Sequence, residues 1–173
     1  MNHYTITITR EFGSLGRPIA KKMSELLGIQ YYDRDIVEKT ATKLNQPVSK
    51  ISDAEESVRP GFLNMKFPLG TGTTAIQDEI FATQSKIVNE LSEKESCIIV
   101  GRCSDYILQN KKNCLHIFIY APVEERLRNC VDTLHMEPET AKRMFKEVDK
   151  ARENYHKHYA KYSPSDFRYK HIL

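Results

Sequence analysis

Hydrophobic and polar residues alternate with a period of two near the N-terminus of the chain. Residues 5–9 read Thr-Ile-Thr-Ile-Thr, and this run of β-branched residues favours a strand. A glycine-containing turn over 10–17 ends the alternation, and apolar residues then recur at helical spacing until Gly28. Pro18 suits the first turn of that helix, where a backbone N–H is not needed. The pattern therefore predicts a strand, a turn and a helix in direct succession.

Strands and helices continue to alternate along the rest of the chain. Short apolar runs predict strands at 29–32, 97–100 and 115–120. Periodic apolar positions predict helices over 34–44, 74–95, 106–108, 123–134 and 138–161. Strands that alternate regularly with helices form a parallel sheet covered on both faces, with ligands at the carboxyl ends of the strands. We expect a three-layer α/β domain with a parallel sheet of about five strands, the last of them short or missing.

Composition narrows the class of protein. The 173 residues suit a single domain, and 40% hydrophobic with 28% charged residues excludes a disordered chain. Residues 46–74 contain several Pro and Gly with few periodic apolar positions, which predicts a mobile excursion. A net charge of +3 without a basic tail disfavours binding to nucleic acid or a membrane surface, and no apolar run could cross a bilayer. We expect a cytoplasmic protein that binds small anions.

The four cysteines, at positions 97, 103, 114 and 130, contain no C-x-x-C pair. This spacing disfavours a zinc knuckle and a thioredoxin-type redox centre. Reduced thiols are expected, and no metal-binding residues are predicted in the chain.

The turn over 10–17 stands where a phosphate-binding loop belongs, between a strand and a helix. Successive backbone N–H groups and a helix N-terminus together attract anions. The pattern G-x-x-x-x-G-K-[ST] is matched only in part, because Glu11, Arg17 and Pro18 replace Gly, Lys and Ser or Thr. Arg17 still offers positive charge to phosphates, whereas the role of a Mg²⁺ hydroxyl ligand falls to Ser14 or water. From this turn alone, a phosphate site and a purely structural turn are both open.

In combination, these residues resemble the cytidylate kinase-like family of P-loop nucleotide kinases. The specific match is the opening Ile6 to Arg17, ITITREFGSLGR, and the branch with this opening ordinarily carries the degenerate loop. Looser matches follow in order at Tyr31–Asp33, Ile99–Ile107, Ile119–Pro122 with Glu125 and Arg126, and Asp149–Arg152 with Tyr155. The resemblance spans nearly the whole chain. It implies one P-loop kinase-like domain over 1–173, with a mobile acceptor-side segment at 46–74 and a lid-like segment at 123–155.

The resemblance also implies the site residues. The donor phosphates would be bound by Gly13, Ser14, Gly16 and Arg17, together with Arg126, Arg128 and Lys150. The acceptor would be bound by Asp33, Arg102 and Asp105, and the catalytic residues would be Arg17, Asp33 and Arg152.

Simpler roles stay open for several of these residues. Asp33 could act only as the N-cap of the helix that follows, and Arg102 could form a surface salt bridge. Asp105 lies one helical turn beyond Arg102 and could merely orient it. The Arg and Lys side chains of segment 123–155 could instead lie on solvated helices and form ion pairs there. Asp149 and Arg152 could be one such pair.

The expected activity is ATP-dependent, Mg²⁺-assisted phosphoryl transfer to a small acceptor, with a nucleoside monophosphate such as CMP as the leading candidate. This reaction needs positioning and charge compensation rather than a covalent protein intermediate. Cytidylate kinases proper usually have Asp where this chain has Cys103, so the identity of the acceptor is open. The alternative is a catalytically inactive nucleotide-binding regulatory protein. Family members typically continue with a strand and a helix beyond the position of Leu173, which leaves open a truncated chain or an incomplete nucleotide site.

Overall fold

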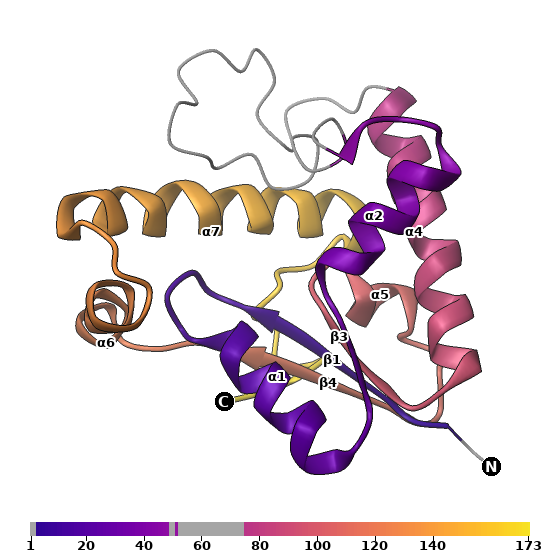
Figure 1. Ribbon diagram of the computed structural model, residues 1–173, viewed down its shortest axis with the longest axis horizontal. Helices are drawn as coiled ribbons and strands as arrows, with labels where there is room; N and C mark the ends of the chain where they lie inside the picture. Colours follow the sequence, from indigo (N-terminus) through magenta and orange to yellow (C-terminus); the bar gives the residue numbers. More distant parts are fainter. Residues whose placement is uncertain (1–2, 49–50, 52–74) are drawn as a thin grey trace.

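A parallel sheet runs through the centre of the computed structural model, which describes residues 3–48, 51 and 75–173 (Figure 1). The strand order is β2-β3-β1-β4-β5, and every neighbouring pair is parallel. The strands are β1 (Thr5–Arg10), β2 (Gln30–Tyr32), β3 (Cys97–Val100), β4 (Cys114–Ile119) and the two-residue edge strand β5 (His171–Ile172). The predicted parallel sheet with a short last strand is confirmed.

The helices follow the predicted periodicity closely. They are α1 (Gly16–Leu27), α2 (Arg34–Lys43), α4 (Ala75–Lys94), α5 (Ser104–Ile107), α6 (Val123–Arg128) and α7 (Pro138–Ala160). The helix predicted over 123–134 is α6 followed by a π-helical turn, Asn129–Thr133. The predicted excursion over 46–74 lies outside the described residues, apart from 46–48 and 51.

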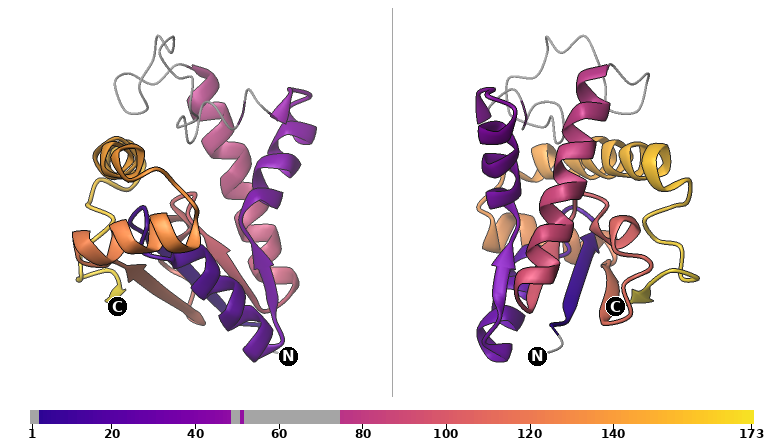
Figure 2. Two further views of the ribbon diagram at one scale, coloured as in Figure 1. Left: turned by 60° about the vertical axis from the view of Figure 1, so that its left-hand side comes forward. Right: turned by 90° about the vertical axis from the view of Figure 1, so that its right-hand side faces the viewer.

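Two apolar layers cover the two faces of the sheet. On one face Ile6 and Ile8 of β1 pack with Ala20 of α1. On the other face Ile99 of β3 packs with Val88 of α4 and with residues of α2 and α5. Figure 2 shows α2 and α4 side by side, away from α1. The central strand β1 is buried along its whole length, so its alternating threonines lie inside the protein rather than in water.

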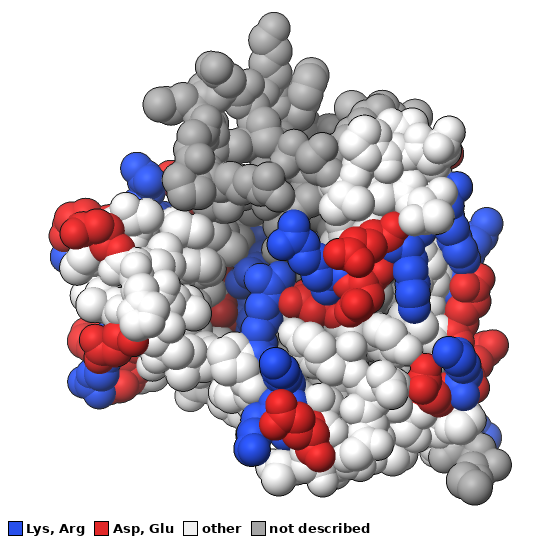
Figure 3. All heavy atoms as spheres, viewed as in Figure 1, with Lys and Arg blue, Asp and Glu red and all other residues white. Residues whose placement is uncertain are grey.

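Helix α7 passes over the carboxyl ends of the strands, where parallel α/β folds bind ligands (Figure 1). This end of the sheet carries the turn after β1, the turn after β3 and the inner face of α7. On the face shown in Figure 3, acidic and basic side chains are interspersed, as expected from the small net charge. Among the described helices, none is long and apolar enough to span a membrane.

Candidate functional site

The turn between β1 and α1 has the backbone of an anion-binding loop. Gly13 has a φ of 79° and Leu15 a φ of 58°, so the chain reverses through left-handed residues. A Cβ on Gly13 would lie 3.0 Å from the Sγ atom of Cys130, which explains the requirement for glycine there. Within the described residues, the backbone N–H groups of Gly13, Ser14 and Leu15 have no hydrogen-bond acceptor. Three successive donors therefore stand beside the first turn of α1.

The Ser14 hydroxyl is already engaged inside this turn. It is buried and donates a hydrogen bond to the carbonyl oxygen of Glu11 at 3.0 Å. Ser14 therefore contributes to the turn mainly through its backbone N–H and through the bond that closes the turn.

Arg17 and Asp33, two of the predicted catalytic residues, form an ion pair at the end of β2. The Nε atom of Arg17 lies 2.5 Å from Oδ2 of Asp33, and Nη2 donates to Oδ1 at 3.3 Å. The arginine side chain is 47% exposed, whereas the carboxylate is only 8% exposed. Asp33 stands at the N-cap position of α2 but makes no capping hydrogen bond with its side chain. Its main partner is Arg17, which counts against a role only as an N-cap.

Tyr31 completes this group, because its hydroxyl donates to Oδ2 of Asp33 at 3.4 Å. Burial and the neighbouring Asp33 raise the pKa of Tyr31 to about 12, although the charges of Arg17 and Arg10 lower it. The phenol is therefore a stable hydrogen-bond donor at neutral pH.

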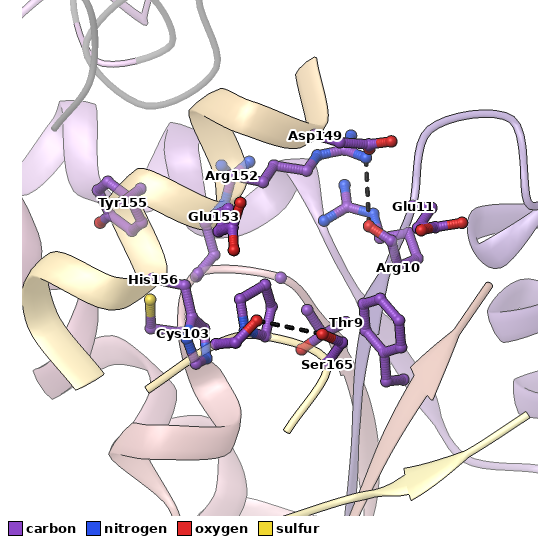
Figure 4. A pocket seen from close by; sticks show the side chains of 15 residues that line it. Thr9, Arg10, Glu11, Cys103, Asp149, Arg152, Glu153, Tyr155, His156 and Ser165 are labelled. Atoms are coloured by element: carbon purple, nitrogen blue, oxygen red, sulfur yellow. Dashed lines mark hydrogen bonds between the residues drawn. The ribbon is translucent and has the colours of Figure 1, made fainter. Parts of the chain in front are cut away.

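A cavity of about 190 Å³ opens at the carboxyl ends of β1 and β3, beneath α7 (Figure 4). Two predicted site residues line it, Arg102 after β3 and Arg152 on α7. The other lining residues are Thr9, Arg10, Glu11, Gly101, Cys103, Phe118, Asp149, Glu153, Tyr155, His156, Ser163, Pro164 and Ser165. Arginines from three separate elements thus line one cavity.

The turn that carries Arg102 has an unusual backbone. Gly101, Arg102 and Cys103 have φ angles of 76°, 61° and 51°, three left-handed residues in succession. For residues other than glycine this conformation costs roughly 1–2 kcal/mol each, and such strain clusters at functional sites. The N–H of Gly101 donates to the carbonyl of Ile8 at 2.9 Å, which ties the turn to β1. The strained turn therefore presents Arg102 at the carboxyl edge.

Cys103 itself is a packing residue in this turn. Its side chain is buried, and burial together with the nearby Asp105 raises the pKa of the thiol well above its usual value. A thiolate nucleophile at this position is disfavoured.

Arg126, which the resemblance assigns to the donor phosphates, is buried against the loop after β1. Its guanidinium is 7% exposed and donates to the carbonyl of Phe12 at 2.6 Å, to Glu11 at 3.3 Å and to Asp149. It also lies over the ring of Phe145, 4.5 Å from the centroid. Asp149 in turn accepts the N–H of Phe12 at 2.7 Å. Arg126 and Asp149 thus hold the loop after β1 against α6 and α7, and the Asp149 carboxylate pairs with Arg126.

Arg128 and Lys150 are exposed and are not among the residues that line the cavity. Arg128 pairs with Glu125 of its own helix at 2.9 Å. Lys150 is exposed, and within the described residues it makes no ion pair. Exposed cations of this kind contribute little to stability, and binding of donor phosphates by these two residues stays a prediction.

Asp105, which the resemblance assigns to the acceptor, is buried behind the cavity lining, where its partner His156 is a lining residue. Its Oδ2 atom accepts from His156 and Lys170, both at 2.8 Å, and from the Tyr162 hydroxyl at 3.0 Å. Burial alone would raise the pKa of Asp105, but the hydrogen bond from His156 and the charge of Lys170 lower it well below its usual range. Asp105 therefore joins α5 to α7 and to the segment before β5.

A family comparison agrees with this geometry. The model of the cytidylate kinase-like family matches residues 5–173. The chain belongs to the cytidylate kinase-like family. A comparison with curated proteins gives no match.

Solved structures place this family member among kinase-like folds. A crystal structure of an uncharacterized protein from Eubacterium ventriosum ATCC 27560 is 26% identical, with a TM-score of 0.71, over 98% of this chain and 86% of that one. Shikimate kinase from Acinetobacter baumannii, in complex with shikimate, is 14% identical with a TM-score of 0.51, over 98% and 82% of the two chains. A gluconokinase from Sinorhizobium meliloti 1021 is 10% identical with a TM-score of 0.53, over 99% and 82%. At these identities the two kinases establish a shared fold.

Sequence reasoning missed one cation of this family member's cavity, Arg10. It appears in the opening motif ahead of the turn, but nothing in the local pattern distinguishes a buried arginine from a surface one. The available signal is its position as the last residue of a strand that is buried on both faces. The side chain of a residue at the end of this strand points either into the site at the carboxyl edge of the sheet or into solvent.

Proposed function

We propose that the protein transfers a phosphoryl group from ATP to a small acceptor bound at the carboxyl edge of the sheet. One observation carries the proposal: Arg10, Arg102 and Arg152 come from β1, the turn after β3 and α7, and all three line one cavity. Arginine pairs with phosphate and carboxylate oxygens through directed, charge-assisted hydrogen bonds. Membership of the cytidylate kinase-like family supports the same reaction class.

The donor side of the reaction is assigned to the loop after β1. The N–H groups of Gly13, Ser14 and Leu15, with Gly16 at the start of α1, would bind the donor phosphates. Arg17 would add positive charge from the rim of this loop. Transfer between two bound substrates requires alignment and stabilisation of the charge on the moving group, and these groups supply both.

The lining of the cavity suits an acceptor that carries both an anionic group and hydroxyl groups. The arginines would hold the anionic group. Ser163, Ser165 and the carboxylate of Glu153 lie on the same cavity and can exchange hydrogen bonds with hydroxyls. A nucleoside monophosphate such as CMP has both features, and so do small hydroxy acids.

The residues present are compatible with a magnesium ion that arrives with the donor. Among the described residues, no three metal-ligating side chains are grouped to hold an ion by themselves. Magnesium typically takes most of its ligands from substrate phosphates and water, with one or two carboxylates. Asp33, at the end of β2, is the side chain proposed to hold one of those waters. The bound ion would compensate charge on the phosphates.

The test is a screen for acceptor-dependent ADP release. The protein is incubated with ATP and Mg²⁺ and with each of a panel of nucleoside monophosphates, hydroxy acids and sugar acids. We expect one acceptor class to stimulate ADP release. Arg152→Met should lower kcat/KM for that acceptor by at least about 100-fold, about 2.7 kcal/mol, the usual cost of removing one donor to developing charge.

Arg143→Met is the matched control for this substitution. Arg143 lies on the same helix but is exposed, and within the part of the chain that the structure describes its one ion pair is with Glu147, at 4.0 Å. Its variant should keep the kcat/KM of the parent protein. Nucleotide binding by calorimetry without turnover of any acceptor would instead favour the regulatory alternative and contradict the proposed reaction.

A further inference from the structure

Arg10 is a buried arginine at the centre of the proposed site. It is the last residue of the central strand β1, and it is only 6% exposed, yet its side chain lines the cavity (Figure 4). Its backbone carbonyl accepts a hydrogen bond from Nη1 of Arg152 at 3.4 Å. A buried arginine that lines a cavity can offer its N–H groups to an anionic ligand there.

Two glycines define the path of the Arg10 side chain. A Cβ on Gly16 would come within 2.6 Å of the Arg10 Cβ atom and 2.8 Å of its Cγ atom. A Cβ on Gly101 would come within 2.6 Å of Nη1 of Arg10. The stem therefore passes beneath the start of α1, and the guanidinium lies against the turn that carries Arg102. The side chain crosses from the donor loop to the acceptor side.

Arg17, the residue that replaces the lysine of the loop pattern, is turned in a different direction. Its Nε and Nη2 atoms contact Asp33 at the end of β2, and nearly half of its side chain is exposed. Burial and Asp33 raise the pKa of Tyr31, which contacts Asp33. Arg10 is close enough to Tyr31 for its positive charge to oppose this rise. The charge of Arg10 thus acts on Tyr31 as well as in the cavity that its side chain lines.

We propose that Arg10 is a phosphate-binding residue and that it contacts the phosphoryl group between donor and acceptor. This inference rests on the proposed phosphoryl transfer and deepens it. It gives Arg10 the role that the lysine has in the pattern G-x-x-x-x-G-K-[ST], which is to place a positive charge on the phosphates. The planar guanidinium of Arg10, whose side chain packs against two glycines, can direct two N–H groups toward phosphate oxygens. Gly16 and Gly101 are then needed because Arg10 fills the space that their side chains would take.

The first test measures phosphate binding directly, without any acceptor. Calorimetry with inorganic pyrophosphate is compared for the parent protein, Arg10→Met and Arg10→Lys, with Arg143→Met as the surface control. We expect Arg10→Met to weaken binding at least about tenfold, Arg10→Lys to weaken it less, and the control to bind like the parent. Circular dichroism and cooperative urea unfolding establish that each variant is folded.

The second test moves Arg10 without replacing it. Gly101→Ala places a methyl group against the guanidinium. Gly28→Ala adds one at the end of α1, where no described residue beyond its own chain neighbours and helix backbone comes within 4 Å. Both glycines have positive φ, 76° and 63°, so both substitutions introduce similar backbone strain. We expect Gly101→Ala to lose pyrophosphate affinity and Gly28→Ala to retain it. This pair remains informative if Arg10→Met does not fold.

The results separate this inference from the proposed function. Pyrophosphate binding that depends on Arg10, in a protein that turns over no acceptor, would support the phosphate-binding role and refute the kinase activity. Acceptor-dependent turnover that survives in Arg10→Met would support the kinase activity and refute the role of Arg10. Unchanged pyrophosphate affinity in folded Arg10→Met and in Gly101→Ala, or a parent protein that does not bind pyrophosphate, would overturn the inference.

Discussion

Replacement of Arg126 by methionine should destabilise the protein by about 3–4 kcal/mol. Removing one partner of a fully buried ion pair costs about 3–5 kcal/mol, but Asp149 and Glu11 are 27% and 30% exposed and can hydrate once the cation is gone. We therefore assign about 1–2 kcal/mol to the lost ion pairs. The hydrogen bond to the Phe12 carbonyl and the contact with the Phe145 ring each add about 1 kcal/mol.

Urea unfolding at pH 7 measures this loss as a lower midpoint at an unchanged slope. The melting temperature should fall by about 6–16 °C for a chain of this length. Arg128→Met is the matched control, because Arg128 is exposed on the same helix and, among the described residues, its one ion pair is with Glu125. Its variant should therefore stay within about 0.5 kcal/mol of the parent. A loss below about 1 kcal/mol in Arg126→Met would refute the assignment of Arg126 as the residue that holds the loop.

Three further predictions concern buried and half-buried groups. Asp105→Asn should lower the unfolding free energy by roughly 3–5 kcal/mol at pH 7, because it leaves Lys170 buried without its carboxylate. The pKa of Asp105 is depressed in the folded state, so its contribution is complete above the unfolded value near 3.8 and is lost as the pH falls further; urea titrations from pH 7 to pH 2.5 should show the two proteins converging. Gly13→Ala should destabilise by about 1–3 kcal/mol in thermal melts, more than Gly28→Ala, because only Gly13 packs closely against its neighbours. Burial raises the pKa of the Cys114 thiol to about 12, so iodoacetamide at pH 8 should modify it at least about 100-fold more slowly in the native protein than in urea, as peptide mass mapping would show.

The architecture was accessible from sequence because it depends on local patterns. The period-two run at 5–9, the turn at 10–17 and the helical periodicity after it predict a strand, a loop and a helix without any knowledge of distant residues. Their alternation predicts a parallel sheet, and the sheet predicts that ligands bind at its carboxyl edge. Arg102 and Arg152 could be proposed on this basis together with the family resemblance, and the structure places both on one cavity.

The roles of the charged residues depended on contacts that span the chain. The local sequence does not distinguish Arg126 from Arg128 and Lys150. Of these three cations only Arg126 is buried, and its partner Phe12 is 114 residues away in the sequence, so the contact forms only in the folded chain. Asp105 is bound by His156, which is 51 residues away in the sequence, and this buried contact could not be seen in the local pattern. The energy of a charge depends on how much water surrounds it and on which groups replace that water.

The amino-acid sequence by itself determined the order of strands and helices, the position of the loop after β1 and the edge of the sheet at which ligands are expected to bind. These features follow from periodicity and from the backbone requirements of individual residues, which act over a few positions. Only the tertiary structure decided that Arg10 lines the cavity while Arg126 holds the loop. Burial and the identity of neighbouring groups are properties of the packed chain, and they decide whether an arginine stabilises the fold or remains available to a substrate.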